Sequence, residues 1–187
     1  MTLASSRAVA LPALRSRALA ALAGALAVAL AAQVAVPLPG TPVPLSLAPL
    51  AVVLVGGLLG ARVGAAALVT YLVMGAVGLP VFAPVGLPGV ARLFGPTGGY
   101  LLAYPVAAAI AGAVTARGTG WVWVLAAPAL GMLAIHAGGV AQLLVLTGSA
   151  AQAVALGTLP FVAGDVLKVG VAALVLRRFA GSTRALR

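Results

Sequence analysis

Two side chains of opposite charge stand three residues apart in a chain that is otherwise almost free of acidic groups. Asp165 is the only acidic residue among 187, and Lys168 is the only lysine. A spacing of three places both side chains on one face of a helix. The carboxylate can accept N–H hydrogen bonds, and the ammonium group can donate to a carbonyl or a carboxylate. The pair suits a ligand with adjacent amide-like donors and an acceptor; an ion pair that holds a helix in place is the alternative.

The segments that position this pair are apolar. Hydrophobic residues make up 64% of the chain and charged residues only 6%, whereas soluble domains carry roughly a quarter charged residues. This composition predicts an integral membrane protein. Ionisable groups inside a membrane segment are costly, so they are usually paired and usually functional. Asp165 and Lys168 are therefore candidate ligand-binding residues.

The apolar segments predict an all-α, polytopic membrane protein with six transmembrane helices in one domain, residues 1–187. Each segment approaches the roughly 20 residues that a membrane-spanning helix needs. Residues 1–15 and 180–187 are predicted tails around a bundle at 16–179, and the proline-rich stretches 36–44 and 79–89 are predicted irregular loops. The predicted helices are Ser16–Ala35, Leu45–Gly60, Val63–Gly78, Gly98–Ala116, Trp121–Leu146 and Phe161–Phe179.

The basic residues predict how these helices cross the cell membrane. Cytoplasmic loops are enriched in Lys and Arg, and six spans with both termini in the cytoplasm place all arginines but Arg92 on that side. The cytoplasmic set is Arg7, Arg15, Arg17, Arg62, Arg117, Arg177, Arg178, Arg184 and Arg187. Both proline-rich loops and the Asp165–Lys168 end of the last helix then lie at the outer face. Because the basic residues are scattered between apolar segments, the net charge of +10 does not predict nucleic-acid binding.

A glycine-rich turn precedes the fourth predicted helix. Helix N-termini present free N–H groups and favour anions. Gly98 and Gly99 would let a ligand approach the backbone, Thr97 can cap the helix, and Tyr100 combines an apolar ring with a hydroxyl. The alternative is a closely packed turn between loop and helix. No lysine follows the motif, so it is not a nucleotide-binding loop.

Arg92 precedes this turn and has two interpretations. A guanidinium can recognise a carboxylate in bidentate fashion, so Arg92 is a candidate ligand-binding residue. It could equally be a solvated arginine in an exposed loop.

His136 lies midway along the fifth predicted helix. Without cysteine or glutamate beside it, it is expected to form a hydrogen bond between helices rather than bind a metal. We expect it on a different helix from Asp165 and nearer the membrane centre, so the two residues are not predicted to form an acid–base dyad. No metal or cofactor is predicted, and the absence of cysteine excludes disulfide and thiolate chemistry.

Small residues recur every four positions along the first predicted helix. Ala21, Ala25 and Ala29 follow the small-xxx-small pattern that lets another helix approach closely. They are predicted either to dock a partner subunit or to pack inside the bundle.

Five runs of sequence occur in order between the first and last predicted helices: Pro37–Pro44, Gly56–Gly60, Tyr71–Phe82, Gly95–Leu101 and Pro160–Lys168. Together they resemble the BioY family, the biotin-specific substrate-binding (S) subunits of energy-coupling factor (ECF) transporters. The resemblance implies the six-helix S-component fold, capture of biotin at the outer face, and no catalysis by the chain itself. It implies as partners a transmembrane coupling subunit and two cytoplasmic ATPase subunits.

The resemblance also implies roles for individual residues. Asp165 and Lys168 would hold the ureido ring of biotin, and Gly98, Gly99 and Tyr100 would line the same pocket. By their chemistry, three further side chains complete this expected site: Phe82 and Phe161 as apolar walls, and Arg92 as the partner of the valerate carboxylate.

Three other functions remain open from the sequence. The chain could carry biotin without ATPase subunits, or the same scaffold could bind a different small vitamin. A membrane enzyme would have to rely on His136 and Asp165 as its acid–base pair, which their predicted positions do not favour.

Overall fold

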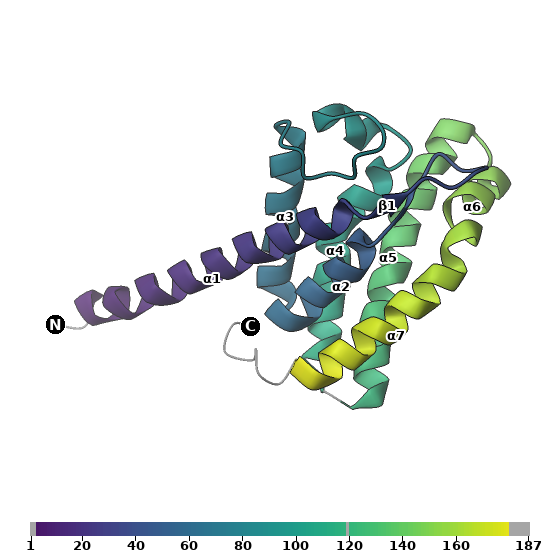
Figure 1. The fold of residues 1–187 in the computed structure, drawn as a ribbon. Helices are drawn as coiled ribbons and strands as arrows, with labels where there is room; N and C mark the ends of the chain where they lie inside the picture. Colours follow the sequence, from purple (N-terminus) through teal and green to yellow (C-terminus); the bar gives the residue numbers. More distant parts are fainter. Residues whose placement is uncertain (1–2, 119, 180–187) are drawn as a thin grey trace.

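The computed structural model describes residues 3–118 and 120–179, with side chains described from Leu14 onward. The basic tail predicted at 180–187, with Arg184 and Arg187, lies outside the described residues. In the described part, seven α-helices are joined by two short 3₁₀ helices and one two-stranded ribbon (Figure 1). The helices are α1 (Leu3–Ala32), α2 (Ala48–Leu59), α3 (Ala61–Ala76), α4 (Gly98–Thr115), α5 (Trp121–Thr147), α6 (Ala150–Gly157) and α7 (Val162–Phe179).

Most predicted helix limits agree with the structure to within a few residues, but three local features differ. Helix α1 begins at Leu3 rather than Ser16, so most of the predicted tail 1–15 is helical. The predicted connection between the last two helices contains the short helix α6, which Ser149 caps by accepting from the Gln152 N–H. Strands β1 (Ala35–Val36) and β2 (Leu45–Ser46) pair antiparallel and close the first proline-rich loop into a hairpin.

Length and composition identify four segments that could cross a membrane: Leu14–Ala32, Gly98–Thr115, Trp121–Thr147 and Ala150–Phe179, the last of which includes both α6 and α7. Helices α2 and α3 are apolar but shorter. At 1.5 Å per residue, their 12 and 16 residues fall short of the roughly 30 Å hydrocarbon core. Gly60, which has φ +84°, joins them at a sharp turn.

Small residues let the helices of the bundle approach closely. A Cβ on Gly56 of α2 would stand 2.1 Å from the carbonyl oxygen of Ala108 in α4. A Cβ on Gly112, one turn further along α4, would stand 2.3 Å from the backbone nitrogen of Ala61. Glycine is therefore required where α4 crosses the α2–α3 turn, and this crossing forms the centre of the bundle.

The alanines proposed for partner docking face this interior. Ala21, Ala25 and Ala29 are buried, and α1 packs along α3 and α2. A Cβ on Gly24, on the same side of α1, would meet Ala67 at 3.0 Å. In this structure they therefore serve as internal packing residues, the alternative expected from the sequence, and their role in docking a partner stays a prediction.

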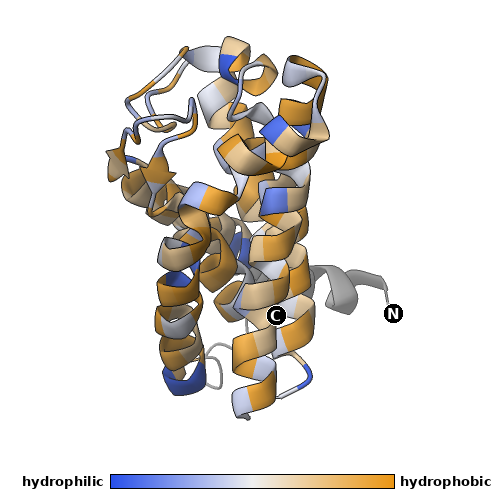
Figure 2. Cartoon of the chain, turned by 90° about the vertical axis from the view of Figure 1, so that its right-hand side faces the viewer, coloured by the Kyte–Doolittle hydropathy of each residue, from blue (hydrophilic) through white to orange (hydrophobic). Residues whose placement is uncertain are grey.

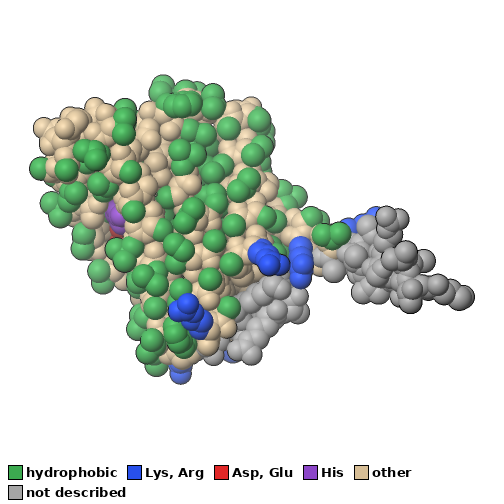
Figure 3. All heavy atoms as spheres, turned by 180° about the vertical axis from the view of Figure 1, so that it is seen from behind, with side chains coloured by type: hydrophobic (Ala, Val, Ile, Leu, Met, Phe, Trp, Pro, Cys, Tyr) green, Lys and Arg blue, Asp and Glu red, His purple; other side chains and the backbone are tan. Residues whose placement is uncertain are grey.

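The outer surface of the bundle is apolar on all sides. Hydrophobic residues dominate every helix in Figure 2, and many large ones, including Leu26, Leu133 and Val145, are exposed. Viewed from behind, hydrophobic side chains are spread over the described surface, and most of the Lys and Arg side chains lie in its lower half (Figure 3). Such a surface matches a lipid environment rather than water.

Candidate functional site

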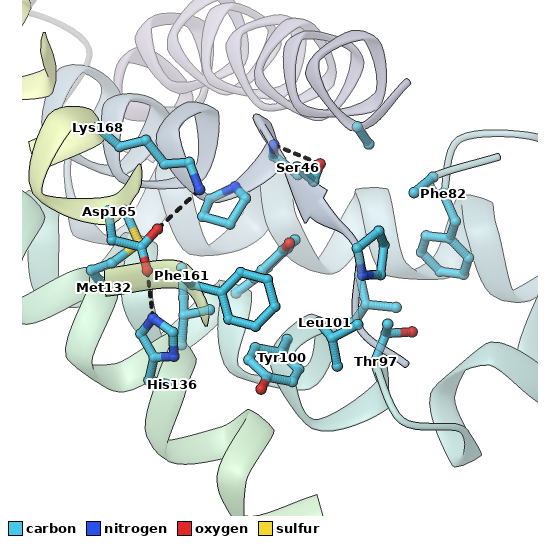
Figure 4. Close-up of a pocket in the computed structure, with 18 of the residues that line it drawn as sticks. Ser46, Phe82, Thr97, Tyr100, Leu101, Met132, His136, Phe161, Asp165 and Lys168 are labelled. Atoms are coloured by element: carbon cyan, nitrogen blue, oxygen red, sulfur yellow. Dashed lines mark hydrogen bonds and ion pairs between the residues drawn. The ribbon is translucent and has the colours of Figure 1, made fainter. Parts of the chain in front are cut away.

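A cavity lies where the irregular segments of the chain meet the ends of α3, α4 and α7 and the middle of α5. Its volume is about 70 Å³, and one side is formed by the hairpin and another by the loop before α4. Figure 4 shows Asp165, Lys168 and His136 on one side, Phe82 and Thr97 on the opposite side, and Tyr100 and Phe161 between them. The lining residues are Ala32, Val43, Pro44, Ser46, Ala48, Pro49, Tyr71, Phe82, Ala83, Arg92, Thr97, Tyr100, Leu101, Tyr104, Met132, Ile135, His136, Phe161, Asp165 and Lys168.

Asp165 and Lys168 form the ion pair that their spacing predicts. Both lie in the N-terminal half of α7, and Lys168 Nζ donates to Asp165 Oδ1 at 2.9 Å. Both side chains are buried and both line the cavity. The first turn of a helix favours a negative charge, so the position of Asp165 is itself favourable. The cavity thus has a carboxylate and an ammonium group side by side.

His136 contacts the same carboxylate, which the sequence analysis did not predict. Its Nε2 lies 2.6 Å from Asp165 Oδ2, and its Nδ1 lies 3.2 Å from the carbonyl oxygen of Gly157. His136 therefore bonds between helices as expected, but the expectation that it stays away from Asp165 is wrong. Packing of α5 against α7 brings the two residues to the same level.

Gly157, at the end of α6, accepts a second hydrogen bond at the site. The hydroxyl of Tyr100 donates to its carbonyl oxygen at 2.6 Å. A Cβ on Gly139 would stand 2.1 Å from the Tyr100 ring, so the glycine of α5 makes room for the tyrosine of α4. Tyr100 thus lines the cavity as predicted, held between α5 and α6.

Arg92 is buried, contrary to the exposed setting expected from the sequence. It lies in the 3₁₀ helix η1 (Gly89–Phe94), where its Nε donates to the Leu87 carbonyl at 2.9 Å and its Nη2 donates to the Ala83 carbonyl. Gly86, with φ +101°, leaves space for the guanidinium group, which would lie 3.2 Å from a Cβ there. Burial lowers the pKa of Arg92, but a guanidinium group remains protonated in proteins. The site therefore has a second buried cation.

Aromatic rings form the walls near Arg92. Phe82 is buried and lies edge-on to Tyr71, with 5.4 Å between ring centroids. The Nε2 of Gln33 lies within hydrogen-bonding distance of the carbonyl oxygens of Pro80, Val81 and Phe82, so the end of α1 holds this loop in place. Phe161, which begins the turn into α7, is also buried and lines the cavity.

Tyr71 is a site residue that sequence reasoning missed. Its side chain is fully buried, lines the cavity, and has a hydroxyl without a hydrogen-bond partner among the described residues. Tyr104 stacks on it at a centroid distance of 6.2 Å. A polar group alone in an apolar helix usually faces the protein interior, and this signal could have identified both Tyr71 and His136.

The glycine-rich turn contributes less to the cavity than predicted. Thr97 lines the cavity, but its side chain does not cap α4, although it occupies the N-cap position. Gly98 and Gly99 do not line the cavity: their Cβ positions point at the carbonyl oxygens of Leu93 and Gly138, at 1.9 Å and 2.1 Å. These two glycines permit close packing of η1 and α5 against α4, which was the alternative interpretation.

The chemistry available in the cavity is recognition through hydrogen bonds and charge. A carboxylate accepts, an ammonium and a guanidinium group donate, and rings surround them. In the described residues, no cluster of three or more His, Cys, Asp or Glu side chains could hold a metal ion. The arrangement fits a small organic ligand with polar groups at two ends and an apolar body.

Comparison with known sequences identifies the family. The profile of the BioY family matches residues 4–185, nearly the whole chain. The chain belongs to the BioY family. With four helices long and apolar enough to cross a membrane, this BioY chain is a membrane protein.

Named relatives of this BioY chain are transporters. A probable biotin transporter BioY from Pyrococcus horikoshii is 39% identical over 142 residues, which covers 76% of this chain and 83% of the relative. A biotin transporter BioY from Thermotoga maritima is 37% identical over 143 residues, covering 76% and 84%. These names describe transporters and not enzymes.

The fold of the BioY chain has a counterpart among solved structures. The crystal structure of the S-component for biotin from an ECF-type ABC transporter superposes with a TM-score of 0.78 at 23% identity. The match covers 95% of this chain and 93% of that protein. The chain therefore has the S-component fold.

Proposed function

We propose that this BioY chain binds biotin in the cavity and serves its uptake as the S component of an ECF transporter. The observation that carries the proposal is the buried pair of Asp165 and Lys168 facing an aromatic cavity. A ureido ring has two N–H groups, which a carboxylate accepts, and one carbonyl oxygen, to which an ammonium group donates. The named relatives, which are biotin transporters, support the same ligand.

The opposite side of the cavity suits the other end of biotin. Arg92 is buried there with its Nε and Nη2 directed to carbonyl oxygens, and its remaining N–H groups are available to a carboxylate. The valerate carboxylate is the anion we assign to it. Phe82 and Phe161 would cover the apolar ring and chain of the ligand. Gly98 and Gly99 have no part in this proposal.

Binding requires the lining segments to move apart. A cavity of about 70 Å³ is smaller than the roughly 300–1,000 Å³ of most small-molecule sites. The loop from Leu79 to Pro88 has no helix or strand and contributes Phe82 and Ala83 to the lining. We propose that this loop opens to admit biotin and closes over it.

The proposed orientation places the cavity outside and the arginine-rich end in the cytoplasm, with six membrane-associated helices between. Arg117 and Arg177 lie at the end of the bundle away from the cavity, at 5.6 Å and 4.5 Å from the ring centroids of Trp123 and Trp121. Tryptophan and arginine are both common at a membrane interface. This arrangement supports cytoplasmic termini, since basic residues gather on that side.

Energy for uptake would come from partner subunits. We propose that a transmembrane coupling subunit and two ATPase subunits assemble with the chain on its cytoplasmic side. The S-component fold supports this partnership, and the sequence has no phosphate-binding loop of its own.

Titration calorimetry of biotin into the detergent-purified chain tests the ligand. We expect tight binding at one site, weaker binding of desthiobiotin, and no heat from thiamine. Asp165→Asn and Lys168→Ala should each weaken binding by more than about tenfold, the scale of one charge-assisted hydrogen bond. No binding by a well-folded sample would reject biotin as the ligand. Uptake that persists in cells without the ATPase subunits would instead favour a carrier that works alone.

A further inference from the structure

His136 faces hydrogen-bond acceptors with both of its ring nitrogens. Nε2 lies 2.6 Å from Asp165 Oδ2, and Nδ1 lies 3.2 Å from the carbonyl oxygen of Gly157. A neutral imidazole has one N–H donor and one bare nitrogen, whereas an imidazolium has two donors. A carbonyl oxygen can only accept. Both contacts can therefore be hydrogen bonds only when both nitrogens carry protons or when Asp165 itself carries one.

The surroundings favour the protonated ring over a protonated carboxyl group. Lys168 donates to Asp165 Oδ1 at 2.9 Å, which stabilises the ionised carboxylate. The hydroxyl of Tyr100 already donates to the Gly157 carbonyl, and the ring of Phe161, 6.3 Å from the imidazole, has no charge. Of the other polar groups lining the cavity, Tyr71 and Tyr104 are neutral, and Arg92 is the remaining cation. With a protonated ring, one carboxylate stands between two cations.

We propose that His136, as an imidazolium, is the residue that positions Asp165 for the ligand and ties it to α6. The role rests on the function proposed above, since Asp165 is there the acceptor of the ureido N–H groups. His136 would orient one carboxylate oxygen and Lys168 the other, leaving the remaining lone pairs directed into the cavity.

Through its contact with Gly157, His136 also helps to hold the end of α6 in place. The end of α6 is held by Tyr100 and His136 at the Gly157 carbonyl and by Thr41, which donates to the neighbouring Leu156 carbonyl at 2.7 Å. His136 is the one of these three that also touches Asp165. It therefore links the position of α6, which sits beside the cavity, to the charge that the ligand meets.

The proposal predicts that affinity falls as pH rises. When the ring loses a proton, it can donate to Asp165 or to Gly157 but not to both. Either the carboxylate loses its orientation or α6 loses one of its ties, and in both cases biotin binds less tightly.

Nuclear magnetic resonance tests the protonation state without any ligand. The chain contains a single histidine, so ¹⁵N-histidine labelling, with a histidine-free purification tag, gives one pair of ring signals. We expect two protonated nitrogens at neutral pH, and a neutral ring in Asp165→Asn. A ring with one protonated nitrogen at neutral pH in the unmodified chain overturns the proposal, whether or not the chain binds biotin.

Calorimetry of three variants tests the positioning role. We compare His136→Gln, whose amide can donate to Asp165 at any pH, with His136→Ala and with the control Gln142→Ala on the same helix. At about pH 6 and about pH 8.5, the unmodified chain and the control should bind biotin more weakly at the higher pH. His136→Gln should bind equally at both.

His136→Ala should bind about tenfold more weakly or worse, the scale of one lost charge-assisted bond. The thermal unfolding of each variant establishes that it is folded. Unchanged affinity in a folded His136→Ala, or the same pH trend in His136→Gln as in the unmodified chain, overturns the role of His136. Failure of the unmodified chain to bind biotin rejects the proposed ligand instead. The protonation state of His136 measured by nuclear magnetic resonance does not depend on that outcome.

Discussion

The two ends of α7 carry charged residues under opposite conditions. Near its start, Asp165 and Lys168 are buried and bonded to each other at 2.9 Å. At its other end, Arg177 and Arg178 are exposed, and their guanidinium groups lie over aromatic rings, 4.5 Å and 5.8 Å from the centroids of Trp121 and Phe179.

The difference between the two ends reflects the free-energy cost of burying a charged group. A buried ion loses its hydration and must recover that energy from a partner of opposite sign. An exposed arginine keeps its hydration and needs no acid, and the chain has only one acid to offer. The single carboxylate is placed beside the buried Lys168, and the exposed end of α7 carries only arginines as charged residues. One helix thus has a buried ion pair near one end and exposed arginines at the other.

Removal of the carboxylate should have the largest effect. Asp165→Ala leaves Lys168 buried without its partner, and breaking such a pair costs about 3–5 kcal/mol of unfolding free energy. The double variant Asp165→Ala/Lys168→Met should recover much of this loss, because it also removes the buried cation. Chemical unfolding in detergent measures both. Equal stability of Asp165→Ala and the unmodified chain would mean that the pair is effectively hydrated.

Arg92 extends the comparison, because it is a buried cation whose described partners are carbonyl oxygens rather than a carboxylate. If the ligand supplies the missing anion, Arg92→Ala should weaken biotin binding by about tenfold to a hundredfold, the range of charge-assisted hydrogen bonds. The neutral biotin amide should bind the unmodified chain weakly and lose little further affinity in the variant. Competition titrations measure this selectivity. A variant that still prefers biotin over its amide would place the carboxylate elsewhere.

Removal of the Tyr71 hydroxyl should have a smaller effect. It should not destabilise the protein without ligand, but it should weaken ligand binding. This buried hydroxyl has no partner among the described residues, and such a group costs about 1–3 kcal/mol of desolvation. Tyr71→Phe should therefore be as stable as the unmodified chain or more stable without ligand.

With ligand, the same variant should lose affinity by about fivefold, the scale of one neutral hydrogen bond. Thermal unfolding with and without biotin measures both states in one experiment. A loss of stability without ligand would show that the hydroxyl has a partner in the empty protein.

Substitution of an arginine at the exposed end of α7 should have the smallest effect. Arg177→Ala removes a contact with the Trp121 ring, and exposed cation–π contacts contribute about 0.5–1 kcal/mol. Loss of this contact should lower the unfolding free energy by about that amount, and biotin affinity should stay the same. Arg178→Ala is the matched control at the next position. A large loss of binding in either would mean that charge at the far end acts on the cavity.

The sequence alone predicted what depends on local geometry. Apolar stretches identified the principal helices, since helix length and hydrophobicity are properties of one segment. The Asp165–Lys168 pair followed from a spacing of three on one helix. Tyr100, Phe82 and Phe161 were also predicted to line the cavity, and they do. The family resemblance, carried by motifs in order, was confirmed by the match over residues 4–185.

Only the tertiary structure decided which surfaces meet. His136 and Asp165 are 29 positions apart, so their contact depends on how α5 and α7 align. Packing of other elements covers Ala21 and its neighbours, buries Arg92, and turns Gly98 away from the cavity. A periodic pattern shows that a helix has a small or polar face, but the neighbour that covers that face comes from distant segments. For that reason the sequence determined the principal helices and the charged pair, and the packing of the helices determined the site around them.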